Sequence, residues 1–168
     1  SGKVIEISLD NKSLSGVISP SISALKSLRT LSLPSNQISG KLPSELSSCI
    51  NLRVLNLTIN NMVGAIPDLS GLRSLEILDL SMNNFSGLFP SWVGNLTGLV
   101  CLGLAQNQFD EGEIPESLGN LNNLAWLYLQ GANLKGEIPE SIFELKLLQT
   151  LDISKNNISG NVSKSIAK

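Results

Sequence analysis

The sequence predicts an α/β solenoid, a right-handed superhelix with a parallel β-sheet on its concave face and short 3₁₀ turns on its convex side. The first observation behind this prediction is a phrase, L-x-x-L-x-L-x-x-N-x-L-x-G-x-I-P-x-x-L-x-x-L, that recurs along residues 1–168 as a single array. The second is its period of 23 to 25 residues, which is typical of proteins whose repeats pack only on their neighbours. About seven copies begin near Val4, Leu28, Leu52, Leu75, Leu99, Leu124 and Leu148.

The opening residues of each copy predict a short β-strand. In the second copy, over residues 28–33, leucines alternate with Thr30 and Ser32, which is the period-two pattern of a strand with one buried face. We expect these strands to stack into a parallel sheet whose outward residues form the concave wall. The outward residues are Glu6, Ser8, Asp10, Thr30, Ser32, Pro34, Val54, Asn56, Thr58, Ile77, Asp79, Ser81, Cys101, Gly103, Ala105, Trp126, Tyr128, Gln130, Thr150, Asp152 and Ser154.

An asparagine follows the strand in most copies and predicts a ladder of side-chain hydrogen bonds. Its short amide can satisfy backbone groups of the turn in its own repeat and in the next, where no regular strand pairing does so. We therefore interpret these residues as structural and not as ligand contacts. They are Asn36, Asn60, Asn83, Asn107 and Asn156.

The L-x-G-x-I-P segment and the residues after it predict the convex side. Glycine tolerates positive φ, and the following proline cannot donate to a strand ladder. Serines, Ser19 and Ser163, replace the proline in the outer copies. The remaining residues, such as 44–46, are too few for a full helix, so we expect 3₁₀ turns there. Trp92 falls at an inward position of this side and is expected to pack in the core.

Composition excludes several functional classes. The formal net charge is -2, so the chain lacks the basic field that holds nucleic acid. It contains no histidine, no phosphate-binding loop and no dinucleotide-binding glycine pattern, so we expect neither an enzyme nor a cofactor or metal site. Cys49 and Cys101 lie three repeats apart, too far for a disulfide.

The two ends of the chain predict a piece of a longer array. The residues from Ser1 to Lys3 lead straight into a repeat, and Lys168 stops the seventh repeat midway. Terminal repeats of a solenoid need polar caps, and none is recognisable here. No apolar run is long enough to span a bilayer, so we expect any membrane attachment to be through a transmembrane segment outside this sequence.

The combined N-x-L and G-x-I-P signals resemble the plant-specific class of leucine-rich repeats over essentially all of the chain. That class is known from receptor kinase ectodomains, receptor-like proteins and secreted inhibitors of wall-degrading enzymes. Within it, three irregularities resemble the early repeats of the peptide-hormone receptor kinases, in particular the receptors for C-terminally encoded peptides and the HAESA-like group. They are a deleted residue at 66–70, an extra residue at 109–115, and Ala132 at the ladder position.

The resemblance implies a secreted peptide lying extended along the inner face, with a co-receptor kinase joining through C-terminal repeats that this chain lacks. It also implies a separate intracellular kinase domain that is absent here. The pocket that reads the peptide's C-terminus belongs to later repeats, so the present residues would meet only its N-terminal part.

Trp126 and Tyr128 are the outward residues that most favour a binding role. The chain has two tryptophans and one tyrosine, and such aromatics dominate binding hot spots, each worth about 2 kcal/mol or more. We expect the small Gly103 and Ala105 beside them to leave clearance for a peptide backbone. The alternative is that the aromatics only cover neighbouring strands. The full set of expected ligand-binding residues is Trp126, Tyr128, Gln130, Asp79, Gln106, Thr150 and Asp152.

Six N-x-S/T sequons favour a secretory route and a location on the extracellular side of the plasma membrane. A glycan on Asn56 would obstruct the concave wall, so we rank its occupancy lowest, and Asn84 and Asn95 are expected to be the better exposed sites. The sequons begin at Asn11, Asn56, Asn84, Asn95, Asn157 and Asn161.

Three functions stay open from the sequence. The first is the ligand-binding segment of a plasma-membrane receptor kinase that perceives a secreted, hydroxyproline-containing peptide hormone. The second is a secreted inhibitor of a cell-wall-degrading enzyme, which predicts a large charged epitope. The third is a scaffold segment of a receptor-like protein, which predicts that substitution of Trp126 and Tyr128 is silent.

Overall fold

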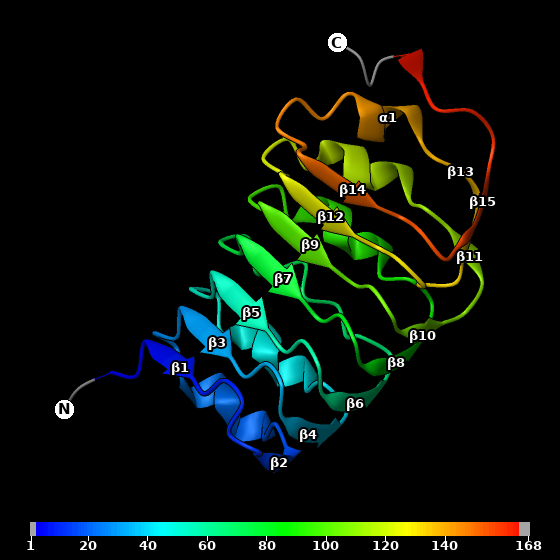
Figure 1. Cartoon of the computed structure of the whole chain (residues 1–168). Coiled ribbons are helices and arrows are strands. Elements are labelled where there is room, and N and C mark those ends of the chain that lie inside the picture. The colour runs from blue at the N-terminus through cyan, green and yellow to red at the C-terminus, as the bar shows by residue number, and fades with distance from the viewer. Residues whose placement is uncertain (1–2, 165–168) are drawn as a thin grey trace.

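The computed structural model describes residues 3–164 and confirms the predicted leucine-rich-repeat solenoid (Figure 1). The expectations placed on Ser1 and Lys168 lie outside the described residues. One short strand from each repeat joins a single seven-stranded parallel sheet, in chain order. Its strands are β1 (Glu6–Ser8), β3 (Thr30–Ser32), β5 (Val54–Asn56), β7 (Ile77–Asp79), β9 (Cys101–Gly103), β12 (Trp126–Tyr128) and β14 (Thr150–Asp152).

The register of this sheet places equivalent residues of each repeat side by side. Tyr128 pairs with Gly103 on one side and with Asp152 on the other. The middle leucine of the inner strands is buried, and Leu127 has no exposed surface. Because side chains alternate along a strand, the residues on either side of each such leucine face outward, as predicted.

Two further parallel sheets, which sequence reasoning missed, are formed by the segments near the recurring glycine of the phrase. They lie along the flank of the solenoid, away from the seven-stranded sheet (Figure 1). One contains β2 (Ser15–Val17), β4 (Gln37–Gly40), β6 (Asn61–Gly64), β8 (Asn84–Gly87) and β10 (Gln108–Phe109). The other contains β11 (Gly112–Glu113), β13 (Leu134–Glu137) and β15 (Asn157–Ser159).

The convex side carries the expected 3₁₀ turns in four repeats, with two exceptions. The 3₁₀ turns are η1 (Pro20–Ala24), η2 (Ser44–Ser48), η3 (Ser91–Asn95) and η4 (Glu116–Asn120). The sixth repeat instead forms one α-helical turn, α1 (Glu140–Phe143). The third repeat, which lacks a residue, has no helical turn, and there the Asp68 Oδ1 atom accepts the Ser70 N–H at 2.8 Å. Trp92 packs against the core, as expected.

The asparagine ladder forms as predicted and ties successive repeats together. The Nδ2 group of Asn60 donates to the carbonyl oxygen of Leu33 in the preceding repeat and to that of Leu57 in its own. Its Oδ1 atom accepts the Ile38 N–H at 2.9 Å. Since Asn60 is only 6 % exposed, its amide satisfies backbone groups that water cannot reach.

Candidate functional site

Strand β12 presents an aromatic pair on the concave face. Trp126 is 38 % exposed and Tyr128 is half-buried, whereas Leu127 between them points into the core. Strand pairing sets Thr150 beside Trp126 and Asp152 beside Tyr128. The structure therefore brings four of the expected ligand-binding residues together on two adjacent strands.

The expected clearance at Gly103 is wrong. A Cβ atom on Gly103 would lie 2.6 Å from Asp79 Cγ and 2.8 Å from Ser81 Oγ, because the Asp79 side chain leans across this glycine. Gly103 and Ala105 are both buried. The absent side chain of Gly103 thus makes room for a neighbouring carboxylate and not for an open channel.

Asp79 and Asp152 are each held by a local hydrogen bond at the end of their strands. The Oδ1 atom of Asp79 accepts the Ser81 N–H at 3.0 Å. The Oδ1 atom of Asp152 accepts the Ser154 N–H at 3.0 Å and the Ser154 hydroxyl at 2.7 Å. The bonds from the Ser154 hydroxyl and N–H lower the pKa of the Asp152 carboxyl below its usual range, so it stays ionised in mildly acidic solution.

The two glutamines of the expected site lie at the rim, just beyond the strands. Gln106 occupies a turn with φ of 51° and is exposed. Its backbone N–H donates to the carbonyl oxygen of Gln130 at 2.8 Å. The two residues are therefore neighbours, next to the aromatic pair.

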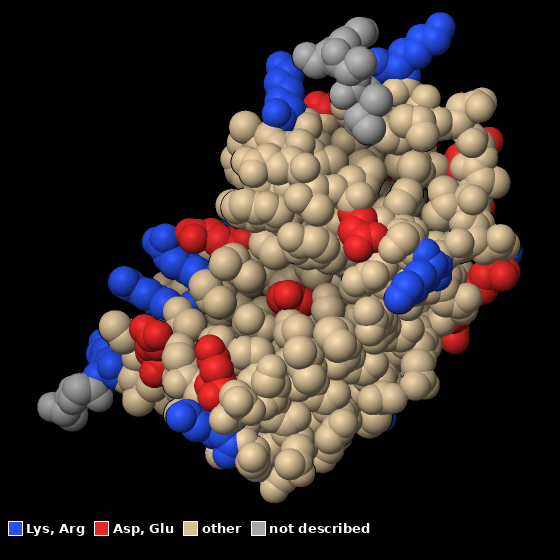
Figure 2. All heavy atoms as spheres, viewed as in Figure 1, with Lys and Arg blue, Asp and Glu red and all other residues tan. Residues whose placement is uncertain are grey.

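The charge of the concave wall has one sign. Seen from the seven-stranded sheet, Figure 2 shows a mostly uncharged surface with isolated acidic side chains, and with Lys and Arg mainly toward its edges. The charged residues at the outward strand positions are Glu6, Asp10, Asp79 and Asp152. The wall therefore suits a ligand that is neutral or positively charged.

Cys101, also on this wall, has a protected thiol. Burial, with a smaller contribution from the Asp79 carboxylate, raises the pKa of the Cys101 thiol to about 11. Cys49 is fully buried, and neither cysteine forms a disulfide, as the sequence predicts. The Cys101 thiol is thus a neutral, weakly polar part of the surface at neutral pH.

The sequon asparagines differ in accessibility. Asn56 is half-buried, and its Oδ1 atom accepts the Thr58 N–H at 3.1 Å. The other five, which include Asn84 on the flank and Asn95 on the convex side, are exposed. This difference agrees with the low rank given to Asn56 and leaves glycan occupancy a prediction.

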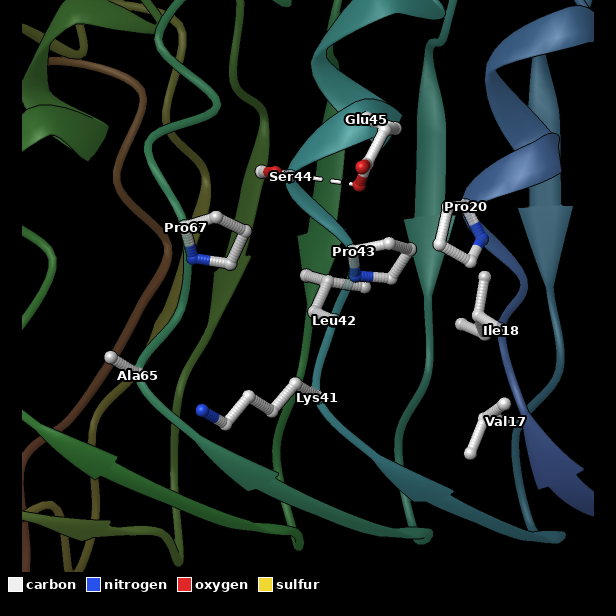
Figure 3. Close-up of a pocket in the computed structure, with 10 residues that line it drawn as sticks. All are labelled: Val17, Ile18, Pro20, Lys41, Leu42, Pro43, Ser44, Glu45, Ala65 and Pro67. Carbon is white, nitrogen blue, oxygen red and sulfur yellow. Dashed lines mark hydrogen bonds between the residues drawn. The ribbon is translucent and has the colours of Figure 1, made fainter.

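Away from the concave wall, a hollow lies on the flank, across the first three repeats. It is a shallow pocket of about 510 Å³ between the strands β2, β4 and β6 and the 3₁₀ turns (Figure 3). Val17, Pro43 and Pro67 contribute apolar walls, and Lys41 and Glu45 are its charged lining residues. Because few polar groups converge in it, it is a weaker candidate than the aromatic pair.

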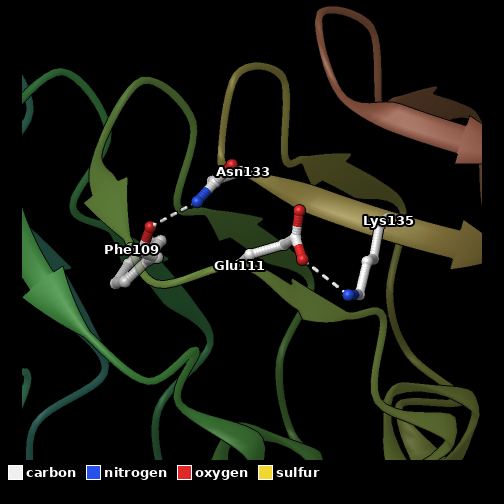
Figure 4. A network of polar contacts seen from close by, with 4 residues as sticks. All are labelled: Phe109, Glu111, Asn133 and Lys135. Carbon is white, nitrogen blue, oxygen red and sulfur yellow. Dashed lines mark hydrogen bonds and ion pairs between the residues drawn. The ribbon is translucent and has the colours of Figure 1, made fainter.

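The extra residue of the fifth repeat forms a bulge that divides the flank into two sheets. Phe109 pairs back with Gly87, whereas Gly112 pairs forward with Leu134. The bulge is joined to the sixth repeat by a salt bridge between Glu111 and Lys135, and the Asn133 amide donates to the Phe109 carbonyl oxygen at 3.0 Å (Figure 4). These two contacts join the fifth and sixth repeats across the break in the flanking sheet.

Comparison with known proteins identifies leucine-rich-repeat models and a plant receptor kinase that are similar to this chain. Models described as leucine-rich repeats match residues 26–71, 50–92, 73–134 and 147–168. The chain is 60 % identical over 134 residues to Receptor protein-tyrosine kinase CEPR2 of Arabidopsis thaliana, covering 80 % of this chain and 14 % of that relative. The chain thus spans about one seventh of the relative's length.

Two solved ectodomains of plant receptor kinases are also similar to this chain. The ectodomain of the Arabidopsis receptor kinase HAESA, in complex with the peptide hormone IDA and the co-receptor SERK1, is 35 % identical with a TM-score of 0.86. The alignment covers 96 % of this chain and 28 % of HAESA. The ectodomain of the receptor kinase SOBIR1 from Arabidopsis thaliana is 38 % identical with a TM-score of 0.71, covering 76 % of this chain and 70 % of that one.

Within residues 3–164, every helix is too short to cross a bilayer as an apolar span.

Proposed function

This chain belongs to the leucine-rich-repeat ectodomains of plant receptor kinases, and on that premise we propose that it is a ligand-binding segment of a receptor that perceives a secreted peptide hormone. The aromatic pair on β12 carries the proposal. An exposed tryptophan beside a tyrosine on a wall of small residues is the composition of a binding hot spot. We propose that the peptide lies extended over β7 to β14, with Trp126 and Tyr128 as its anchors.

The dimensions of the sheet support an extended ligand. At about 4.8 Å between neighbouring strands, the seven-stranded sheet spans about 30 Å, which is the length of some eight or nine extended residues, and its four strands from β7 to β14 span about 14 Å, the length of some four. A hydroxyproline-containing peptide suits such a surface, because a chain that is already stiff and extended loses less conformational entropy on binding.

We further propose that the whole receptor is a glycoprotein, with this segment on the extracellular side of the plasma membrane and an intracellular kinase domain elsewhere in its sequence. A co-receptor kinase would join through repeats that follow this chain. The complex of HAESA with a peptide hormone and SERK1 supports this arrangement for a related ectodomain.

The inhibitor function is the second candidate, and the concave wall argues against it. The large charged epitope that this function predicts is not found there, because charges occupy only four of the outward strand positions within residues 3–164, two of them in the first repeat. The scaffold function makes a different prediction, that the aromatic pair is silent in binding.

A binding titration and a parallel inhibition assay separate the three functions. The complete ectodomain that contains this chain is titrated by calorimetry with synthetic hydroxyproline-containing peptides, and is assayed in parallel for inhibition of fungal wall-degrading hydrolases. Peptide binding that weakens in Trp126→Ala supports the receptor function. Inhibition without peptide binding supports the inhibitor, and peptide binding indifferent to Trp126→Ala supports the scaffold.

A further inference from the structure

We propose that the aromatic pair and the carboxylates on either side of it form a site for a lysine or arginine side chain of the bound peptide. This inference rests on the proposed function and adds a chemical specificity to it. The site consists of Trp126, Tyr128, Asp79 and Asp152.

The carboxylates lie on both sides of Tyr128. Asp152 is its direct partner on β14, one strand spacing away. Asp79 lies two strands away on the other side, but its side chain leans over Gly103, the residue paired with Tyr128. The small residue at position 103 therefore lets a carboxylate approach Tyr128 from the second side.

Both carboxylates are held in place before any ligand arrives. The fixed hydrogen bonds to Ser81 and Ser154 use the Oδ1 atoms, so Oδ2 is the oxygen that each residue can offer to a ligand. Ordering these side chains in advance reduces the entropy lost on binding.

No cation on the wall competes for the site. The outward strand positions within residues 3–164 hold four acidic residues and no lysine or arginine. Lys155, in the turn after β14, lowers the pKa of Asp152 less than the Ser154 hydrogen bonds do, and it forms no salt bridge with Asp152.

The aromatic rings add the second half of the recognition. A guanidinium or ammonium group over the face of a tryptophan or tyrosine at an exposed site is favoured roughly 2- to 5-fold. A screened ion pair adds a further factor of roughly 1.4 to 5. Together these interactions predict a preference of roughly 3- to 30-fold for a cationic over a neutral side chain.

The test uses matched peptides and conservative variants. Synthetic hydroxyproline-containing peptides carry arginine, its neutral isostere citrulline, or glutamate at one scanned position, and their affinities for the complete ectodomain are measured by calorimetry. The variant Asp79→Ser/Asp152→Ser removes both charges without creating an N-x-S/T sequon. A serine hydroxyl can accept the N–H two residues on that each aspartate accepts now, so the strand ends are expected to stay intact. Glu6→Gln, at the far end of the sheet, is the control.

At one scanned position, the arginine peptide is expected to bind roughly 3- to 30-fold more tightly than the citrulline peptide. This preference is expected to fall in the double variant to the roughly 2- to 5-fold that the aromatic rings supply, to persist in Glu6→Gln, and to shrink at high salt. Equal affinities for arginine and citrulline at every position would overturn this inference and leave the proposed function standing. The absence of binding by any peptide would overturn the proposed function and this inference with it.

Discussion

The Oδ1 atom of Asn156 accepts two backbone N–H groups of the preceding repeat, those of Ala132 and Leu134, each at 3.0 Å. The regular rung of Asn60 accepts only one, from Ile38. The difference arises because Ala132 occupies the position where the ladder asparagine of the sixth repeat is missing. The next residue, Asn133, adopts a φ of 57°, and Asn156 of the seventh repeat accepts hydrogen bonds from both backbone N–H groups.

The first repeat shows the same compensation. Lys12 stands at its ladder position, Ser13 after it has φ of 54°, and Asn36 accepts the N–H groups of both Lys12 and Leu14. Loss of a ladder asparagine is therefore accommodated by a defined backbone change together with the rung of the next repeat.

Asn156→Ala is expected to loosen the sixth repeat. It leaves two backbone donors and the Leu129 carbonyl without their partner, which costs about 2–4 kcal/mol of local opening free energy. Hydrogen exchange at the amides of Ala132 and Leu134 should accelerate roughly 30- to 1000-fold. Asn157→Ala, at the exposed neighbouring position, is the control and should leave these rates unchanged. Unchanged exchange in Asn156→Ala would show that the ladder does not hold this turn.

Asn133→Val is expected to destabilise the chain, because a β-branched residue at positive φ costs about 1–3 kcal/mol and the bond to the Phe109 carbonyl is also lost. Asn133→Gly loses the same bond but keeps the conformation, so its loss should be smaller. Asn157→Val, at the equivalent position of the seventh repeat, where the residue lies in strand β15, should be tolerated. The melting temperatures of the three variants test this order, and equal effects of Val and Gly at residue 133 would contradict it.

Gly103→Ala is expected to cost about 1–3 kcal/mol, because the new methyl group meets the Asp79 carboxylate and the Ser81 hydroxyl. The Ser81 hydroxyl also accepts the Ala105 N–H, so it cannot move freely. Adding Asp79→Ala should restore part of the lost stability in urea denaturation. If the two substitutions simply add, the contact across Gly103 does not exist in solution.

Cys101 is expected to resist alkylation at pH 8. With its pKa raised to about 11, little thiolate is present, and the rate with iodoacetamide should be at least about 20-fold below that of glutathione. Asp79→Ser removes the smaller cause of the shift without creating an N-x-S/T sequon and should lower the pKa of the Cys101 thiol, so alkylation should quicken. Peptide mapping by mass spectrometry measures both, and rapid labelling of the wild type at pH 8 would disprove the burial of this thiol.

The sequence predicts the concave sheet, the inward leucines and the asparagine ladder, because each depends on a pattern that recurs in every repeat. It does not predict the flanking strands, since their segments are short and their partners lie in other repeats. The lean of Asp79 over Gly103 was also missed, and with it the loss of the expected clearance. A glycine between two outward side chains is consistent with an open channel or with a neighbour filling it, and only the packing decides.

The central claim is that the concave face at β12 binds a peptide, and calorimetric titration of the complete ectodomain with hydroxyproline-containing peptides tests it most directly. Wild type is compared with Trp126→Ala/Tyr128→Ala, and Trp92→Phe on the convex side serves as the aromatic control. The account predicts that the best wild-type binding is weakened at least about 30-fold in the double variant, as expected for a loss of about 2 kcal/mol or more, and is retained in the control. Equal affinities of wild type and the double variant would contradict it.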